Sequence, residues 1–202
     1  MAKKFTLIAL LVVLGLICIY GVVAVRRGFS TRDTPSAVES FAAAMARDMA
    51  IPANARLMRN PVTASSDVYA DARAHFADHC AQCHANNGSG DTPIGRNLYP
   101  KPPDMRLAKT QNKSDGELYY TIQYGIRLSG MPAFGEPVDN DEDTWKVVTF
   151  IRHLPELSEQ EETEMQHLNP KAPNEIREET EEDNFLNGAA KSAQPQTYMH
   201  HH

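Results

Sequence analysis

The hydrophobic positions of this 202-residue chain form one unbroken apolar run near the start and several short periodic stretches after it. Residues 5–25 carry no charged side chain, and roughly 20 apolar residues match the hydrocarbon thickness of a bilayer. The lysines before the run also suit a secretory signal, but the run exceeds the roughly 7–15 residues of a signal core and lacks an Ala-x-Ala cleavage site. We therefore predict a transmembrane anchor over residues 5–25, after a short cytoplasmic end at residues 1–4, with a signal sequence as the alternative.

A second apolar pattern lies in the alanine-rich stretch 34–49, where Phe41, Met45 and Met49 recur at four-residue spacing. This spacing predicts an amphipathic helix. The helix would pack on its own domain or on the membrane surface, with docking of a partner as the alternative. A polar connector with two prolines follows, so residues 26–64 are predicted to be a linker that contains this helix.

The next part of the chain, residues 65–155, contains three stretches with helical periodicity and no alternating pattern typical of strands. The predicted helices cover residues 67–80, 114–124 and 143–154. Ser65 or the serine after it can cap the first helix, a capping box of Ser114 and Glu117 opens the second, and Pro155 stops the third. Residues 65–155 are therefore predicted to form one all-α domain.

The stretches between and after these helices show no sustained period. Residues 85–113 are rich in Gly, Pro and Asn, which predicts a loop, and loops of this length usually are functional or wrap around something. Residues 156–202 begin with a strongly acidic run, which predicts a solvated, partly disordered tail with a short surface helix over residues 158–168. The terminal histidines, residues 200–202, suit a tag remnant, a disordered end or a weak metal site.

Charge and cysteine content narrow the class of protein. The formal net charge of −6 argues against nucleic acid as a partner, because phosphate binding needs a basic face. Of the three cysteines, Cys18 lies in the apolar run, which leaves Cys80 and Cys83 for chemistry and excludes a disulfide framework.

Residues 80–84 read Cys-Ala-Gln-Cys-His, which we call the CAQCH motif. Its two thiols can add to the vinyl groups of a haem, and this tether places the imidazole of His84 beneath the iron. A zinc site or a redox dithiol is the alternative, but the globular part contains no second CxxC pair and no βαβ pattern. We therefore predict one covalently attached haem c with His84 as an iron ligand.

Haem iron held by one imidazole needs a sixth ligand if it is to carry electrons without binding gases or peroxide, and methionine and histidine are the candidates. Met131 lies in a Gly-Met-Pro-Ala-Phe-Gly loop between two predicted helices, far enough along the chain from His84 to reach the other haem face. Met105 is nearer in sequence to the proximal side. We therefore predict Met131 as the second iron ligand. Three helical histidines are not expected to bind iron: His75, His79 and His153.

Across about residues 65–154 the chain resembles the class I cytochrome c family. Family members carry a small residue and an aromatic residue eight and four positions before the first haem cysteine, where the N-terminal helix crosses the C-terminal helix. Here these positions hold Ala72, in place of the usual glycine, and Phe76, while Phe150 is the aromatic of the later helix. The resemblance implies the class I cytochrome c fold, an all-α fold around one covalent haem, here preceded by a transmembrane helix.

The resemblance also implies a partner for the imidazole of His84. In the family a proline carbonyl after the motif accepts the Nδ1 hydrogen, and Pro103 is the expected residue, with Pro100 and Pro102 close by as alternatives. Bonds of this kind orient the ring and tune the iron. Weaker candidates for hydrogen bonds to the haem propionates are Arg96, Asn97, Tyr99, Arg127 and Trp145.

A haem closed by His84 and Met131 leaves no position for a substrate, so the expected role is electron carriage and not enzymatic catalysis. Haem attachment in this family occurs outside the cytoplasmic membrane, which implies an N-terminus inside and a domain outside. The predicted role is transfer between a quinol-oxidising complex and a terminal oxidase or reductase on the periplasmic side of a bacterial inner membrane. The alternatives are a fixed cytochrome subunit of such a respiratory complex and, from another class, a haem gas sensor or peroxidase-like enzyme.

Overall fold

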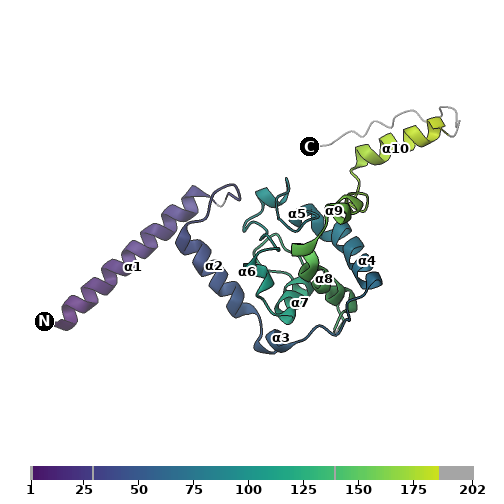
Figure 1. The fold of residues 1–202 in the computed structure, drawn as a ribbon. Helices are drawn as coiled ribbons and strands as arrows, with labels where there is room; N and C mark the ends of the chain where they lie inside the picture. Colours follow the sequence, from purple (N-terminus) through teal and green to yellow (C-terminus); the bar gives the residue numbers. More distant parts are fainter. Residues whose placement is uncertain (1, 29, 139, 187–202) are drawn as a thin grey trace.

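The computed structural model describes residues 2–28, 30–138 and 140–186, and within these ranges the chain is helical, with no β-strand. The α-helices are α1 (Ala2–Arg27), α2 (Ala37–Ala50), α3 (Ala53–Leu57), α4 (Ser66–His75), α5 (Ala81–His84), α6 (Ala108–Gln111), α7 (Asp115–Tyr124), α8 (Glu142–His153), α9 (Glu159–Gln166) and α10 (Pro173–Leu186). Figure 1 shows α1 and α10 extending away from the group formed by α3 to α9. The predicted all-α fold is confirmed.

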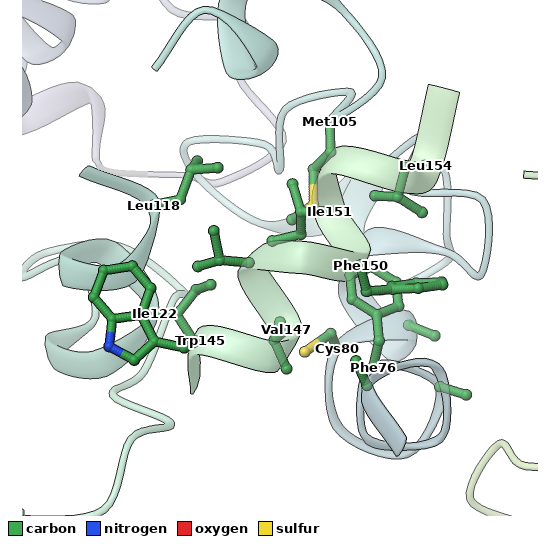
Figure 2. Close-up of a cluster of buried hydrophobic side chains, with 14 of the residues drawn as sticks. Phe76, Cys80, Met105, Leu118, Ile122, Trp145, Val147, Phe150, Ile151 and Leu154 are labelled. Carbon is green, nitrogen blue, oxygen red and sulfur yellow. The ribbon is translucent and has the colours of Figure 1, made fainter. Parts of the chain in front are cut away.

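The core forms where α4 crosses α8 and where α8 packs on α7. Ala72 of α4 is buried at the crossing, and its small side chain allows the two helices to approach closely. The rings of Phe76 and Phe150 meet there with centroids 5.2 Å apart, within the range of favourable aromatic pairs. On the α7 side, Trp145 stacks on Tyr119 at 4.1 Å. Figure 2 shows this cluster and confirms that α8 supplies much of it.

Side-chain caps fix where the core helices begin, largely as predicted. Ser65 caps α4 by accepting a hydrogen bond from the backbone N–H of Val68, which decides between the two adjacent serines. Ser114 and Glu117 form the predicted capping box of α7. The helix ends at Gly125, whose φ of +66° is a conformation that glycine adopts without strain.

The helix predicted over residues 67–80 does not stop at Cys80. After α4 the chain makes a π-helical turn, η1 (Phe76–Cys80), and then continues as α5 to His84. The backbone N–H of Ala81 donates to the carbonyl of Phe76, five residues earlier, which is the bond that defines a π turn. This wider turn rotates the CAQCH motif relative to α4, and such turns often occur at functional sites.

The folded domain begins before residue 65, its predicted first residue. The Asn60 side-chain amide donates to the Trp145 carbonyl at 3.0 Å and to Thr149 Oγ1 at 2.9 Å, so the predicted linker is attached to α8. Ala55 of α3 is buried, and a Cβ placed on Gly116 would lie 1.8 Å from its carbonyl oxygen. The connector therefore packs on the domain, because its few apolar and amide groups have partners on α7 and α8.

The packed unit also continues past the predicted boundary at residue 155. A short 3-10 turn, η3 (Leu154–Glu156), leads into α9, and Met165 of α9 is completely buried in the core cluster. Arg73 of α4 pairs with Glu164 at 3.0 Å, and His153 contacts Glu161 at 3.0 Å. The predicted short surface helix is thus part of the domain, while α10 buries no residue. The part of the tail beyond residue 186, with its terminal histidines, lies outside the described residues.

None of the described side chains of the two N-terminal helices is buried. Within α1, residues 4–27 form a candidate membrane span, whose most apolar stretch has a mean hydropathy of 3.0 and is not buried against the rest of the chain. The amphipathic helix predicted over residues 34–49 is present as α2, capped by Ser36. None of its residues is buried.

Candidate functional site

The CAQCH motif lies where η1 passes into α5. Cys80 and His84 are buried, Cys83 is half-buried, and both cysteines are free thiols. Residues three apart on a helical turn lie on the same side, so the two thiols share one face of this turn. Figure 2 shows Cys80 beside Phe76 and Val147 at the edge of the hydrophobic core.

Burial controls the protonation of both thiols. It raises the pKa of Cys80 to about 12, with a smaller contribution from the neighbouring Cys83, and it also raises the pKa of Cys83. Redox-active dithiols need the opposite shift, because the thiolate is the reactive form. The described residues also contain no group of three or more His, Cys, Asp or Glu side chains able to hold a metal ion. The raised pKa values of the two thiols therefore do not favour the redox-dithiol alternative.

His84 presents a neutral imidazole in a buried position. Burial lowers its pKa to about 4, so the ring is uncharged at neutral pH, which is the form that binds metals. Its Nδ1 is buried without a hydrogen-bond partner among the described residues. Pro103, the expected acceptor, is exposed and does not meet this nitrogen. An unsatisfied buried ring nitrogen is unusual and often marks a functional group.

The loop after the motif folds back and binds its carbonyl groups. The N–H of Gly90 donates to the carbonyl of His84 at 2.7 Å, and the Thr92 hydroxyl donates to the carbonyl of Gln82 at 2.7 Å. The N–H of Gly95 then donates to the Thr92 hydroxyl oxygen at 2.8 Å. These bonds satisfy carbonyls that a helix end leaves open, and they fix the turn that carries His84.

Gly95 makes this folded-back loop possible. A Cβ at this position would lie 2.5 Å from the carbonyl oxygens of both Cys83 and Gly90, too close for any side chain. Thr92 and Gly95 could not be predicted as part of the site from the sequence, because the stretch shows no periodicity. A threonine among glycines soon after a short helix is the signal that could have indicated a side-chain cap.

The Met131 loop is held against the end of α7. The N–H of Ile126 donates to the carbonyl of Met131 at 3.0 Å, and the N–H of Met131 donates to Ser129 Oγ at 3.1 Å. A Cβ on Gly125 would lie 2.6 Å from the backbone of Pro132, so glycine is needed for this close approach as well as for its positive φ. The loop is therefore short, bonded to itself and anchored.

The structure brings this loop to the motif-bearing helix. Met131 and Phe134 are half-buried and pack on the core cluster that contains Cys80. The ring of Phe134 meets that of His79 edge-on, with centroids 6.5 Å apart. A cavity of about 80 Å³ between the two segments is lined by Cys80, Ile122, Phe134 and Val147, with His75 and four further polar residues, Glu136, Asp141, Asp143 and Thr144. Met105, the other methionine considered as an iron ligand, lies buried within the core.

The weaker candidate residues have local partners or face solvent. Arg96 pairs with Asp91 at 2.5 Å, and the Asn97 amide donates to the Pro93 carbonyl at 2.8 Å. The remaining three are placed as follows: Tyr99 donates to Glu39, the Trp145 indole donates to Asn140 Oδ1, and Arg127 is exposed. Their roles toward propionates stay predictions.

The residues present fit a covalently bound haem c. Two protonated thiols share one face of a fixed turn, a neutral imidazole with an unpartnered nitrogen follows directly, and a thioether on an anchored loop packs on the same core. His75 and His79, which are not expected to bind iron, contact each other: their ring centroids lie 4.7 Å apart in a stacked arrangement.

The domain is similar to a known protein family. Residues 67–151 match the family model described as cytochrome c oxidase, cbb3-type, subunit III. A search of curated proteins found no matching relative. The matched range starts in α4, contains both the CAQCH motif and the Met131 loop, and ends in α8.

Proposed function

Since the chain carries a class I c-type cytochrome domain at residues 67–151, we propose that it transfers single electrons through one haem c bound to the CAQCH motif. A domain of this family implies covalent haem c. When bound, haem supplies an iron that changes by one unit of charge and so accepts or donates one electron. The observation that carries the proposal is the fixed turn on which a buried, neutral His84 follows two free thiols.

Each residue of the site has a distinct part in this proposal. Cys80 and Cys83 would hold the haem through thioether bonds, and the imidazole of His84 would bind its iron. The bonds from Gly90 and Thr92 to the motif carbonyls keep the imidazole in place. Nδ1 of His84 has no hydrogen-bond partner in the part of the chain that the structure describes. With haem bound, it would donate to a carbonyl of the 100–103 segment, and Pro103 stays the predicted acceptor.

Met131 decides the type of chemistry. Its sulfur would occupy the sixth iron position, exclude exogenous ligands and raise the reduction potential relative to bis-histidine ligation. The hydrogen bonds at Ile126 and Ser129 hold this loop in a single tight conformation, which suits a permanent ligand. We therefore propose electron carriage rather than catalysis for the domain itself.

The candidate span in α1 supports a membrane-attached carrier. Domains of this family are usually found outside the cytoplasm, so we propose an N-terminus inside and a haem domain on the periplasmic side of a bacterial inner membrane. Its redox partners would be respiratory complexes or their subunits. In that position it would transfer electrons between a quinol-oxidising complex and a terminal oxidase or reductase.

A second candidate is a fixed subunit of a terminal oxidase, and the description of the matching family favours it. The two possibilities differ in the stability of the complex. Mild detergent extraction followed by affinity purification of this chain would yield stoichiometric large hydrophobic subunits if it is a fixed subunit. Recovery of the chain without such subunits would support the free carrier.

Covalent attachment is tested by haem staining after denaturing electrophoresis. The variant Cys80→Ala with Cys83→Ala should lose the stained band, because both thioether bonds are removed. Cys18→Ala is the matched control, since it removes the cysteine in α1, and it should stain as the unmodified protein does. Staining retained in the double variant would contradict the proposed site.

A further inference from the structure

Helix α2 turns an apolar stripe toward solvent. Val38 is 78 % exposed, Phe41 68 %, Met45 51 % and Met49 76 %. At 100° per residue these four positions fall on one side of the helix, together with Ala42. Large apolar side chains gathered in this way on a solvent-exposed face mark an interaction surface.

The opposite side of α2 is the one that faces the domain. Ala44 and Arg47 are its half-buried positions, and on the helical wheel they lie away from the stripe. Three polar contacts join α2 to the domain: the Tyr99 hydroxyl donates to Glu39, the Arg56 guanidinium donates to the Asp48 carbonyl, and Lys113 pairs with Asp48 at 3.2 Å. The domain therefore holds α2 in an orientation that leaves the stripe uncovered.

We propose that this stripe, which consists of Val38, Phe41, Met45 and Met49, lies in the surface of the membrane that α1 spans. The proposal rests on α1 being a membrane anchor. Only residues 28–36 separate α1 from α2, and a chain of this length extends at most roughly 30 Å. Figure 1 shows the start of α2 beside the C-terminal end of α1, with the chain turning between the two helices.

The chemistry of α2 favours a lipid surface over a protein partner. Helices that lie in the interface combine an apolar face with a charged face and have low net hydrophobicity. Helix α2 carries Glu39 and Arg47 away from its stripe, and Asp48 at the edge of the stripe, where Lys113 pairs with it. Arg26 and Arg27 at the end of α1 suit the headgroup layer. A lipid surface is present wherever α1 spans a bilayer, so the stripe is covered without any additional protein.

This arrangement would fix how the domain faces the bilayer. The residues that hold α2 belong to the connector, to the loop after the motif and to the segment before α7: Arg56, Tyr99 and Lys113. With α2 in the membrane surface, this side of the domain faces the lipid. The domain would then present a constant face to redox partners instead of tumbling on a flexible tether.

Spin labels on the full-length, haem-loaded protein test this proposal in vesicles of phosphatidylcholine and phosphatidylglycerol. In a Cys18→Ser background, single labels are attached at Phe41→Cys and Met45→Cys on the stripe. Matched labels at Ala43→Cys and Ala50→Cys probe the other side of the same helix. The Cys18→Ser protein without an introduced cysteine should take up no label, because the motif thiols are in thioether bonds.

Oxygen concentrates in lipid, whereas a charged nickel chelate stays in water, so the ratio of their collision rates with the label reports the environment. We expect this ratio to be at least roughly threefold higher at positions 41 and 45 than at 43 and 50, as for helices in the interface. Equal ratios at all four positions would overturn the proposal. So would labels at 41 and 45 that neither reagent reaches, because protein would then cover the stripe.

Vesicle flotation and haem staining of the same samples separate the possible failures. Protein that does not float with the vesicles lacks a working anchor, which overturns the inference about α2. Haem staining and the absorption spectrum are unaffected by that result, so the proposed electron-transfer function would stand. Loss of haem staining with intact flotation would instead contradict the function.

Discussion

Helices α8 and α2 are both amphipathic, yet one lies in the centre of the core and the other contributes nothing to it. In α8, Trp145 and Phe150 are completely or almost completely buried against α7 and α4. In α2, the aromatic Phe41 and its neighbours on the stripe face solvent, and no residue of the helix is buried. An apolar period therefore predicts a helix and its apolar face, but the surface that covers this face depends on the rest of the molecule.

The two helices also differ in what their apolar faces affect: the stability of the domain or its position on the membrane. Burial of a large apolar side chain stabilises a fold by roughly 1.5–3 kcal/mol relative to its exposure, and α8 obtains this from several residues. Since α2 buries none, the domain should fold equally well without its apolar side chains. The stripe would matter for the position of the domain on the membrane and not for its stability.

The largest effect is expected from truncating the aromatic residues of the two helices. Phe150→Ala should lower the free energy of unfolding by about 3–5 kcal/mol, since it leaves a cavity at the crossing of α4 and α8. The same change at Phe41 should alter it by less than about 0.5 kcal/mol. Denaturant unfolding of the haem-loaded protein measures both. A loss at Phe41 comparable to that at Phe150 would show that α2 is part of the folded core.

A second pair of variants tests where the packed domain ends. Met165→Ala should cost about 2–4 kcal/mol, because this side chain is completely buried although it lies beyond the boundary predicted from the sequence. Met49→Ala, on the exposed stripe, should change the unfolding midpoint very little. If Met165→Ala were also neutral, α9 would be attached to the surface without contributing to the core.

A smaller effect concerns pH. Burial lowers the pKa of His75 below its ordinary value, the nearby His79 lowers it further, and Asp143, Asp141 and Asp78 act in the opposite direction. The unfolded chain therefore binds more protons at this residue than the folded chain does once the pH falls to about 6.5. Stability should decline as the pH drops from neutral through that value, and the decline levels off below the folded pKa.

The variant His75→Asn should weaken this part of the decline. The half-buried position is screened by solvent, so the difference should stay within about 0.5 kcal/mol. Unfolding midpoints at pH 7.5 and pH 5.5 for both proteins measure it. An unchanged pH dependence in the variant would show that other groups cause the decline.

The sequence was sufficient to predict the parts of the fold that depend on local chemistry. Serine caps, the Ser114–Glu117 box and the four-residue spacing of Ala72 and Phe76 were visible without any structure, because caps and helix faces involve neighbours in the chain. The π turn at residues 76–80 could not be predicted in this way. It is a property of how α4 and α5 must both fit the core.

Partners that are distant in sequence were the ones missed. Asn60 lies in a polar connector with no period, and its bonds reach Trp145 and Thr149, 85 and 89 residues away. Met165 is the one apolar residue of α9, which lies in an acidic run that by composition indicates a solvated tail. Thr92 caps the motif from within a loop. In each case only the tertiary arrangement gives the side chain its role.

The absorption spectrum of the oxidised protein tests the central claim, that His84 and Met131 together close the haem iron of the CAQCH motif. Methionine ligation gives a weak sulfur-to-iron charge-transfer band in the near infrared. We predict this band in the unmodified protein, its loss in Met131→Leu, and its retention in Met105→Leu, the matched change at the buried core methionine. An unmodified protein without the band, or a Met131→Leu variant that keeps it, would contradict the account.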